Sequence, residues 1–261
     1  FWEADPQEWG RYFHTNLYGV MNCCHVALPG MVREKKGRIV TIVSDSGRVG
    51  EARLASYAAA KCGVAVSDQP TGPFKYLGSF RPDAGVWPEN VTAADKIPGK
   101  KNALERDFKG GQMARDLTVF VDDDGKAYLF YSSEENPTMH VSLLTDDYLH
   151  TAGKYARIFV GRSMEAPAVF KRAGKYYFIG SGCTAWAPNA ARSAVADSPF
   201  GPWKELGNPC IGPDATNTFH AQSTFVLPVS GHPDELIFMA DRWKQWDLPA
   251  SSYLWLPVEM Q

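Results

Sequence analysis

Three polar residues stand at matching places along the sequence and are the strongest candidates for chemistry. Asp116, Glu165 and Gln222 each lie just before a segment that reads as a β-strand. Equivalent strands of repeated units converge on a common axis, so we expect these three side chains to meet. Two carboxylates in one site can serve as a general acid and as a group that tunes the pKa of that acid. The spacing therefore predicts an acid–base site.

The elements that would position these residues are short antiparallel strands. Around Glu165, the Ala173-Gly174 turn separates two strands, and a Pro/Gly turn precedes another. Four strands within roughly 45 residues are typical of one blade of a β-propeller. The strands predicted for this blade are Pro167–Phe170, Tyr176–Ser181, Ala191–Ala196 and Trp203–Leu206.

Internal repeats extend this pattern over residues 66–261. Val66–Gly78 and Val195–Gly207 are identical at eight of thirteen positions, with an offset of 129 residues. Self-similarity at a fixed offset indicates a repeat architecture. Arg81–Met113, long and polar, is predicted to be either an ordered insertion over one face or a disordered loop. The predicted blade segments are Val64–Leu77, Leu117–Phe159, Ala168–Leu206 and Ser223–Val258.

Residues 1–65 follow a different pattern. A helix from Pro6 to Val26, a buried strand over Gly37–Ser44 and an Ala-rich helix from Tyr57 predict a small α/β fragment of Rossmann type. The residues with matching chemistry here are Asn16, Ser44, Tyr57 and Lys61. Tyr57 and Lys61 lie one helical turn apart, on one face.

With the Gly-Arg-Ile-Val strand, these four residues resemble the catalytic half of a short-chain dehydrogenase/reductase. The resemblance implies that Tyr57 donates a proton to a carbonyl, with Lys61 lowering its pKa and Ser44 bonding the same oxygen. The Gly-rich dinucleotide turn of that family does not occur here. We therefore expect vestigial dehydrogenase residues and no bound cofactor.

Residues from Val64 onward carry motifs of a second family. Arg115-Asp116-Leu117-Thr118, Glu165-Ala166-Pro167 and Gln222-Ser223-Thr224 resemble glycoside hydrolase family 43, closest to its exo-β-1,3-galactanase branch. The resemblance implies a five-bladed propeller and cleavage with inversion. It implies that Glu165 is the general acid, that Asp116 raises its pKa and that Gln222 lies near the attacking water. Further motifs of this resemblance are Ser67–Phe74 and Ser181–Asn189.

The predicted fold is mainly β, a partial, truncated five-bladed propeller preceded by the α/β fragment. The predicted domains are residues 1–65 and residues 66–261, joined without a Pro/Gly/Ser linker, which suggests a chimera. The early strands of the first blade and the closing blade are replaced or missing, so impaired activity is expected. Candidate subsite residues are Trp186, Asn189, Arg242 and Trp243, with core packing the alternative for both tryptophans.

Composition narrows the possible partners. A net charge of −2 gives no electrostatic footprint for nucleic acid. No apolar run approaches about 20 residues, so no membrane span is predicted. The five cysteines show no metal-binding spacing, so no metal is expected. We expect buried free thiols rather than a disulfide. Cys183 and Cys210 could form a disulfide only if the protein were exported. No signal peptide is evident, and neither location nor oligomeric state is predicted.

Three functions follow from these patterns. The leading hypothesis is an inverting glycoside hydrolase acting on a β-linked galactose polymer or a related polysaccharide. The alternatives are an NAD(P)-dependent short-chain oxidoreductase and a propeller that binds carbohydrate without cleaving it.

Overall fold

The computed structural model describes residue 33 and residues 64–66, 75–78, 80–229, 231–247 and 250–260. The chain forms two compact units, Phe1–Phe80 and Arg81–Gln261. The domain boundary predicted at residues 65 and 66 stays a prediction. Among the described residues of the first unit, β1 (Val64–Val66) pairs antiparallel with β2 (Lys75–Gly78). The predicted site residues Asn16, Ser44, Tyr57 and Lys61, and the helices and strand around them, lie outside the described residues.

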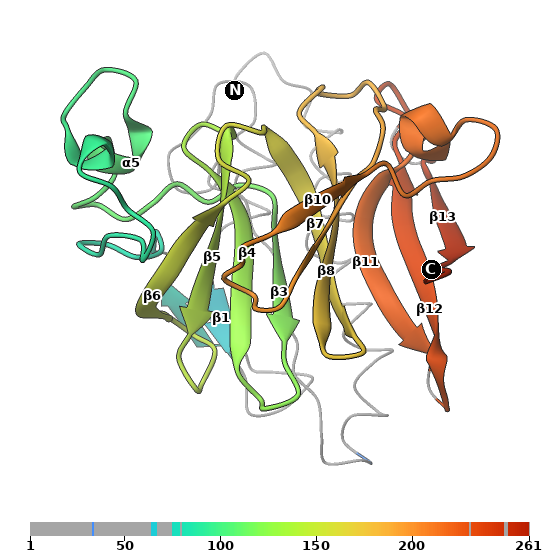
Figure 1. Cartoon of the computed structure of the whole chain (residues 1–261), viewed down its shortest axis with the longest axis horizontal. Helices are drawn as coiled ribbons and strands as arrows, with labels where there is room; N and C mark the ends of the chain where they lie inside the picture. The colour runs from blue at the N-terminus through green and yellow to red at the C-terminus, as the bar shows by residue number, and fades with distance from the viewer. Residues whose placement is uncertain are drawn as a thin grey trace. The chain divides into compact units, whose positions relative to one another are not determined.

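The described part of the second unit consists mainly of antiparallel sheets, with few helical turns (Figure 1). Two sheets have four strands each, in the orders β3-β4-β5-β6 and β7-β8-β9-β10, and a third has the order β11-β12-β13. These sheets coincide with the three predicted blade segments of this unit. The strands are β3 (Leu117–Val121), β4 (Ala127–Ser133), β5 (Thr138–Leu144), β6 (Thr151–Ile158), β7 (Met164–Arg172), β8 (Lys175–Gly182), β9 (Arg192–Ala196), β10 (Lys204–Gly207), β11 (Gln222–Val229), β12 (His232–Arg242) and β13 (Ser252–Pro257).

The sheets pack face to face through two apolar cores. Phe130 and Met139 of the first sheet meet Phe178 of the second, with Trp203 against them. A second core joins the β7–β10 sheet to the β11–β13 sheet, with residues such as Phe170 and Phe238. Strand β7 contacts both β3 and β11, so the first strands of successive sheets are neighbours. Sheets stacked in this way belong to the propeller class; the five-bladed count stays a prediction.

The turn predicted between β7 and β8 forms as expected. Ala173 and Gly174 both have positive φ, 48° and 76°, and Arg172 pairs with Lys175 across them. A two-residue turn with two positive φ values has the twist that a tight β-hairpin requires. This hairpin sets the register in which β7 and β8 begin to pair, from Arg172 and Lys175 onward.

Of the two alternatives predicted for Arg81–Met113, the structure shows the ordered one. The segment carries η2 (Ala94–Lys96) and α5 (Ala103–Arg106). It covers the free edge of β6, where the Glu89 amide donates to the Tyr155 carbonyl at 2.8 Å and Asn90 exchanges two bonds with the Arg157 backbone. Covering an edge strand removes a surface that could pair with another chain. We call residues 81–113 the insertion.

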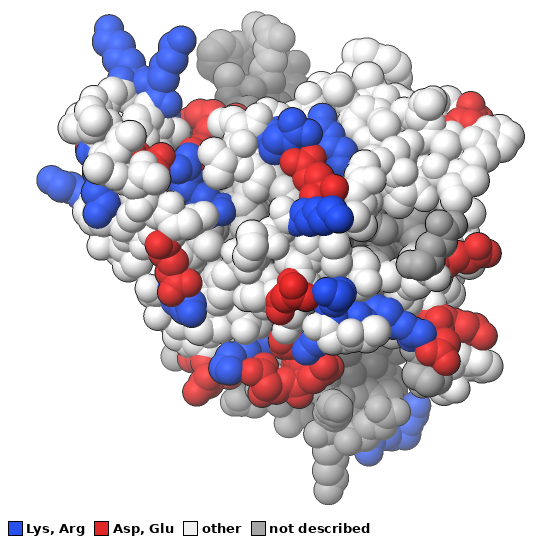
Figure 2. All heavy atoms as spheres, in the orientation of Figure 1, with Lys and Arg blue, Asp and Glu red and all other residues white. Residues whose placement is uncertain are grey.

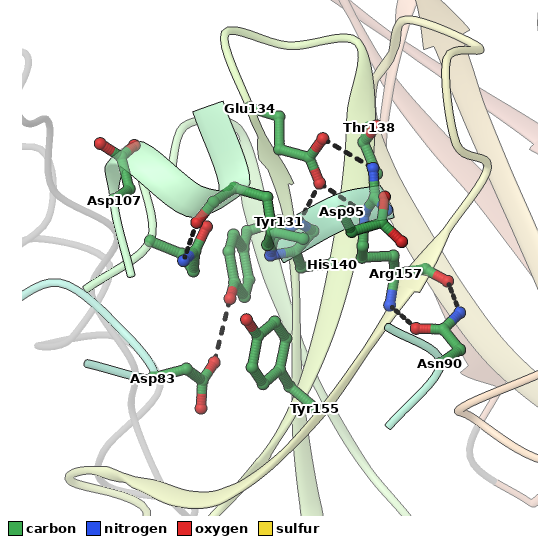
Figure 3. Close-up of polar contacts among 12 residues, drawn as sticks. Asp83, Asn90, Asp95, Asp107, Tyr131, Glu134, Thr138, His140, Tyr155 and Arg157 are labelled. Carbon is green, nitrogen blue, oxygen red and sulfur yellow. Dashed lines mark hydrogen bonds and ion pairs between the residues drawn. The ribbon is translucent and has the colours of Figure 1, made fainter. Parts of the chain in front are cut away.

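A buried polar network anchors the insertion to the first sheet (Figure 3). Arg157, with its side chain only 11% exposed, binds Glu134 at 2.7 Å and Asp95 at 2.6 Å. Glu134 also contacts His140, which is fully buried. Tyr131 on β4 and Ser142 on β5 donate hydrogen bonds to the buried carboxyl of Asp83 in the insertion. Desolvation raises the pKa of Asp83 despite these bonds.

We expect Arg157→Met to lower the free energy of unfolding by about 3–5 kcal/mol, because it leaves the Glu134 carboxylate buried without its cation. Urea unfolding followed by tryptophan fluorescence would measure this. Lys154→Met on the same strand is the matched control: Lys154 is 46% exposed and lies 3.4 Å from Glu89, so its loss should cost less than about 1 kcal/mol. Equal effects of the two variants would contradict the anchoring role.

Candidate active site

Glu165 lies inside β7, not before it as the sequence analysis predicted. Its register partner is Ser181 on β8, and the pairing shifts between Glu165 and Ala168. Ala166 has a φ of 53°, in the left-handed region that residues other than glycine seldom occupy. An extra residue in one strand re-aims the neighbouring side chain. This bulge directs the half-buried Glu165 carboxyl towards Gln222.

The two peptide groups on either side of the Ala166 Cα are held from the two neighbouring sheets. The Ala166 amide donates to Asp116 Oδ2 at 3.2 Å, and the Ala166 carbonyl accepts from Ser223 Oγ at 2.6 Å. Asp116 directly precedes β3, and Ser223 lies on β11. A left-handed alanine costs of order 1–3 kcal/mol, so its surroundings must maintain it. These two bonds bring Asp116 and Ser223, the neighbour of Gln222, into contact with Ala166, the neighbour of Glu165.

Gln222 is the first residue of β11 and contacts the Glu165 carboxyl directly. Its Nε2 donates to Glu165 Oε1 at 3.1 Å and to Ser181 Oγ at 3.0 Å. Its Oε1 accepts from Trp243 Nε1 at 3.3 Å. The carboxamide orientation is thus determined by three partners, and Glu165 and Gln222 form one hydrogen-bonded cluster.

Electrostatics favour a protonated Glu165. Desolvation and the nearby charge of Asp116 raise the pKa of Glu165, although hydrogen bonds from Cys183 and Gln222 oppose the shift. Asp116 keeps contact with solvent, yet the protein around its carboxylate raises its pKa as well, mainly by desolvation. Burial and the Glu165 charge raise the pKa of the Cys183 thiol to about 11, so it is a hydrogen-bond donor rather than a thiolate.

Trp186 and Trp243 form an exposed aromatic pair beside this cluster. Their ring centroids lie 5.8 Å apart in an edge-to-face arrangement, and the two residues are 48% and 47% exposed. Of the two alternatives predicted for them, this exposure excludes core packing. Their contact with a substrate stays a prediction.

Asn189 and Arg242 hold backbone in place. The Asn189 side chain exchanges two hydrogen bonds with the backbone of Gly182. The backbone carbonyl of Asn189 accepts from Thr218 Oγ1 at 2.7 Å. Arg242 Nε donates to the carbonyl of Phe219 at 2.9 Å. Thr218, Phe219 and the following residue all have positive φ. Asn189 and Arg242 therefore stabilise the strained segment that leads into Gln222, and their predicted contact with sugar stays a prediction.

One carboxylate near the cluster escaped the sequence analysis. Asp241 on β12 is the register partner of Gln222, and side chains of directly paired residues share one face of an antiparallel sheet. Desolvation raises its pKa. Its position directly before Arg242-Trp243, which the sequence analysis did select, was the available signal.

The remaining features concern hollows, metals and cysteines. A hollow of about 490 Å³ is lined by Cys183, the hydrogen-bond partner of Glu165. A second hollow, of about 440 Å³, is lined by Arg162, Asn189 and Arg192. Glu165 itself lines neither hollow. Within the described residues, no group of three or more metal-ligating side chains gathers, and no helix is long and apolar enough to cross a membrane.

Cys183 and Cys210 are both free, but Cys183 is exposed, not buried as predicted.

Solved structures with a similar fold are family 43 enzymes. A family 43 β-1,3-galactosidase with galactodeoxynojirimycin superposes with a TM-score of 0.71 and 46% identity, over 76% of this chain and 63% of that one. The exo-β-1,3-galactanase of Clostridium thermocellum superposes with a TM-score of 0.61 and 36% identity, over 76% of this chain and 40% of that one. A third structure is a glutamate-to-glutamine variant of the Phanerochaete chrysosporium exo-β-1,3-galactanase with β-1,3-galactotriose. It superposes with a TM-score of 0.57 and 32% identity, over 76% of this chain and 39% of that one. The C-terminal three-quarters of this chain resembles glycoside hydrolase family 43.

The N-terminal part resembles an unrelated family. Residues 1–67 match the short chain dehydrogenase model. The 3-oxoacyl-(acyl-carrier-protein) reductase of Staphylococcus aureus is 45% identical over 58 residues, which are 22% of this chain and 24% of that protein. The Staphylococcus epidermidis enzyme is 41% identical over 103 residues, or 40% of each. The chain thus spans between a quarter and two-fifths of these curated relatives, and its two parts resemble different families, as predicted.

We expect Asp116→Asn to lower the pKa of Glu165, because it removes a negative charge that disfavours the Glu165 carboxylate. Asparagine keeps an oxygen that can accept the Ala166 amide, so the bulge should persist. The ¹³C shift of the Glu165 carboxyl against pH would measure the change. Asp124→Asn, at an exposed carboxylate paired with Lys126, is the control and should leave the titration in place. An unshifted titration in Asp116→Asn would show that the two carboxyls are not coupled.

Proposed function

We propose that the Arg81–Gln261 unit is a glycoside hydrolase that cleaves β-1,3-linked galactose with inversion. The observation that carries the proposal is the cluster in which Glu165, with a raised pKa, bonds to Gln222 and lies beside Asp116. The neighbouring family 43 structures support the class of reaction, and their galactose-based ligands support the choice of sugar.

In this proposal Glu165 donates its proton to the glycosidic oxygen as the bond to the anomeric carbon breaks. A general acid must be protonated at the working pH, and the desolvated position of Glu165 beside Asp116 favours that form. Asp116 acts by its charge on Glu165 and by holding the Ala166 amide. Gln222, whose amide has no basic site at neutral pH, orients the attacking water.

Inversion also requires a base that takes a proton from water on the opposite face of the sugar, about 6.5–9.5 Å from the acid. We assign this role to Asp241. Its support is the pairing with Gln222 across β11 and β12. Trp186 and Trp243 would offer an aromatic face to the C–H groups of the sugar.

Glu165→Gln should slow hydrolysis of β-1,3-galactobiose by about 10²–10⁴-fold, because glutamine cannot protonate the leaving oxygen. It should slow hydrolysis of an aryl β-galactoside much less when the phenol leaves without protonation. Galactose release, with the anomer identified by proton NMR, measures both the rate and the inversion. Glu205→Gln, which removes a half-exposed carboxylate on β10 that pairs with Arg162, is the matched control and should keep wild-type rates.

Equal losses on both substrates would contradict the acid role of Glu165. Binding of the galactobiose by the wild-type chain without any turnover would instead favour the carbohydrate-binding propeller.

The match of residues 1–67 to a dehydrogenase family supports a second candidate function, NAD(P)-dependent reduction of a carbonyl. It would use Ser44, Tyr57 and Lys61. Saturable binding of NADPH to the full chain, followed by fluorescence and lost in Tyr57→Phe/Lys61→Met, would support it. Galactoside hydrolysis should be unaffected by the same pair of substitutions.

A further inference from the structure

The hollow of about 490 Å³ beside Glu165 lies between the insertion and the ends of the sheets. Lys100, Lys101 and Arg106 line it on the insertion side, and Asn136 and Cys183 line it on the sheet side. Glu165 does not line the hollow itself, but Cys183, which does, bonds through its thiol to the Glu165 carboxyl, so the hollow lies one side chain away from the proposed acid. A volume of this size is in the range of pockets for small ligands.

The charge of this hollow is positive once its internal ion pairs are taken into account. The Glu134 carboxylate forms an ion pair with Arg157, so its charge is neutralised. The Glu135 carboxylate pairs with Arg106 at 2.8 Å and with Arg115 at 3.4 Å. Within the described part of the chain, no carboxylate lies in ion-pair range of Lys100 or Lys101. Figure 2 shows basic side chains projecting from the region of the insertion around α5. Both lysines are exposed, so their charges are available to a ligand.

The sheet side of the hollow is held in an unusual backbone conformation. Glu134, Glu135 and Asn136, in the β4–β5 turn, have φ values of 53°, 64° and 75°. The ion pairs of both glutamates hold this turn. Asn136 Oδ1 is buried and has no hydrogen-bond partner among the described residues. Such an oxygen can accept a bond from a hydroxyl group of a ligand.

We infer that this hollow is a subsite for a negatively charged sugar substituent, a uronic acid carboxylate or a sulfate ester, on the galactan chain. Lys100 and Lys101 bind the anionic group, and Asn136 Oδ1 accepts a sugar hydroxyl. The subsite accepts a substituent adjacent to the bond that Glu165 protonates, so the inference rests on the proposed function. It adds a preference for acidic over neutral galactans.

The test measures binding by isothermal titration calorimetry to the full chain carrying Glu165→Gln, which stops turnover. The probes are neutral β-1,3-galactotriose and the same trisaccharide with either a glucuronic acid or a sulfate substituent. We expect at least one charged probe to bind about 3- to 10-fold more tightly than the neutral one at low salt. The gain should shrink as the salt concentration rises. The charged probe that binds more tightly than the neutral one identifies the anionic group, a uronic acid carboxylate or a sulfate ester.

Lys100→Gln/Lys101→Gln should reduce the gain to less than twofold and leave the affinity for the neutral probe unchanged. Lys109→Gln, at an exposed lysine of the same insertion that does not line the hollow, should keep the gain. Equal affinities for charged and neutral probes, or a gain that survives the double substitution, would overturn the subsite while leaving the hydrolase proposal intact. Lysine-dependent binding of a charged probe with no binding of neutral trisaccharide would support the anion site and count against the galactanase site.

Discussion

The arrangement around Glu165 depends on the backbone of a single residue, Ala166. The amide of Ala166 donates to Asp116 and its carbonyl accepts from Ser223, so residues at the starts of two neighbouring sheets hold one strained alanine. Loss of either hydrogen bond would destabilise the left-handed conformation of Ala166. The direction of the Glu165 side chain would then change as well. Asp116 therefore contributes twice, by geometry through Ala166 and by charge through its effect on the pKa of Glu165.

Two sets of carboxylates in this unit differ in how their charge is compensated. Asp107, Asp122 and Glu134 lie beside arginine or lysine, and their pKa values are lowered. Glu165, Asp116 and Asp241 occupy desolvated positions without an ion pair among the described residues, and their pKa values are raised. Ion pairs that fasten loops need ionised carboxylates, whereas proton transfer near neutral pH needs a carboxyl whose neutral form is accessible. In the second set, Glu165 bonds to Gln222, Asp241 pairs with Gln222 across the strands, and Asp116 bonds to the amide of Ala166 next to Glu165.

The insertion links the structural network of Figure 3 to the surface beside this site. Arg157, on the edge strand β6, contacts Glu134 in the β4–β5 turn and Asp95 in the insertion. The same turn and the same insertion supply opposite sides of the hollow next to Cys183. Buried ion pairs contribute modestly to net stability but strongly to geometry, since breaking one leaves a buried charge. Here they fix the separation between Lys100–Lys101 and Asn136.

The sequence by itself determined the repeat architecture and the identity of the principal candidates. Alternating apolar residues, the Ala173-Gly174 turn and the internal repeats were sufficient to locate each sheet of the second unit within a few residues, because strand periodicity and turn chemistry are local. Asp116, Glu165 and Gln222 were selected because they recur at one place in the repeat. The predicted assignments of Asn16, Ser44, Tyr57 and Lys61 fall outside the described residues.

Only the tertiary structure decided how these groups act on one another. The bulge at Ala166, the exposure of Trp186 and Trp243, and the loop-holding bonds of Asn189 and Arg242 all depend on contacts between sheets that are far apart in sequence. The approach of Asp241 to Gln222 depends on strand register, and the hollow beside Cys183 depends on where the insertion docks. Local sequence specifies strands and turns. Desolvation, charge coupling and the convergence of side chains arise only when the sheets pack together.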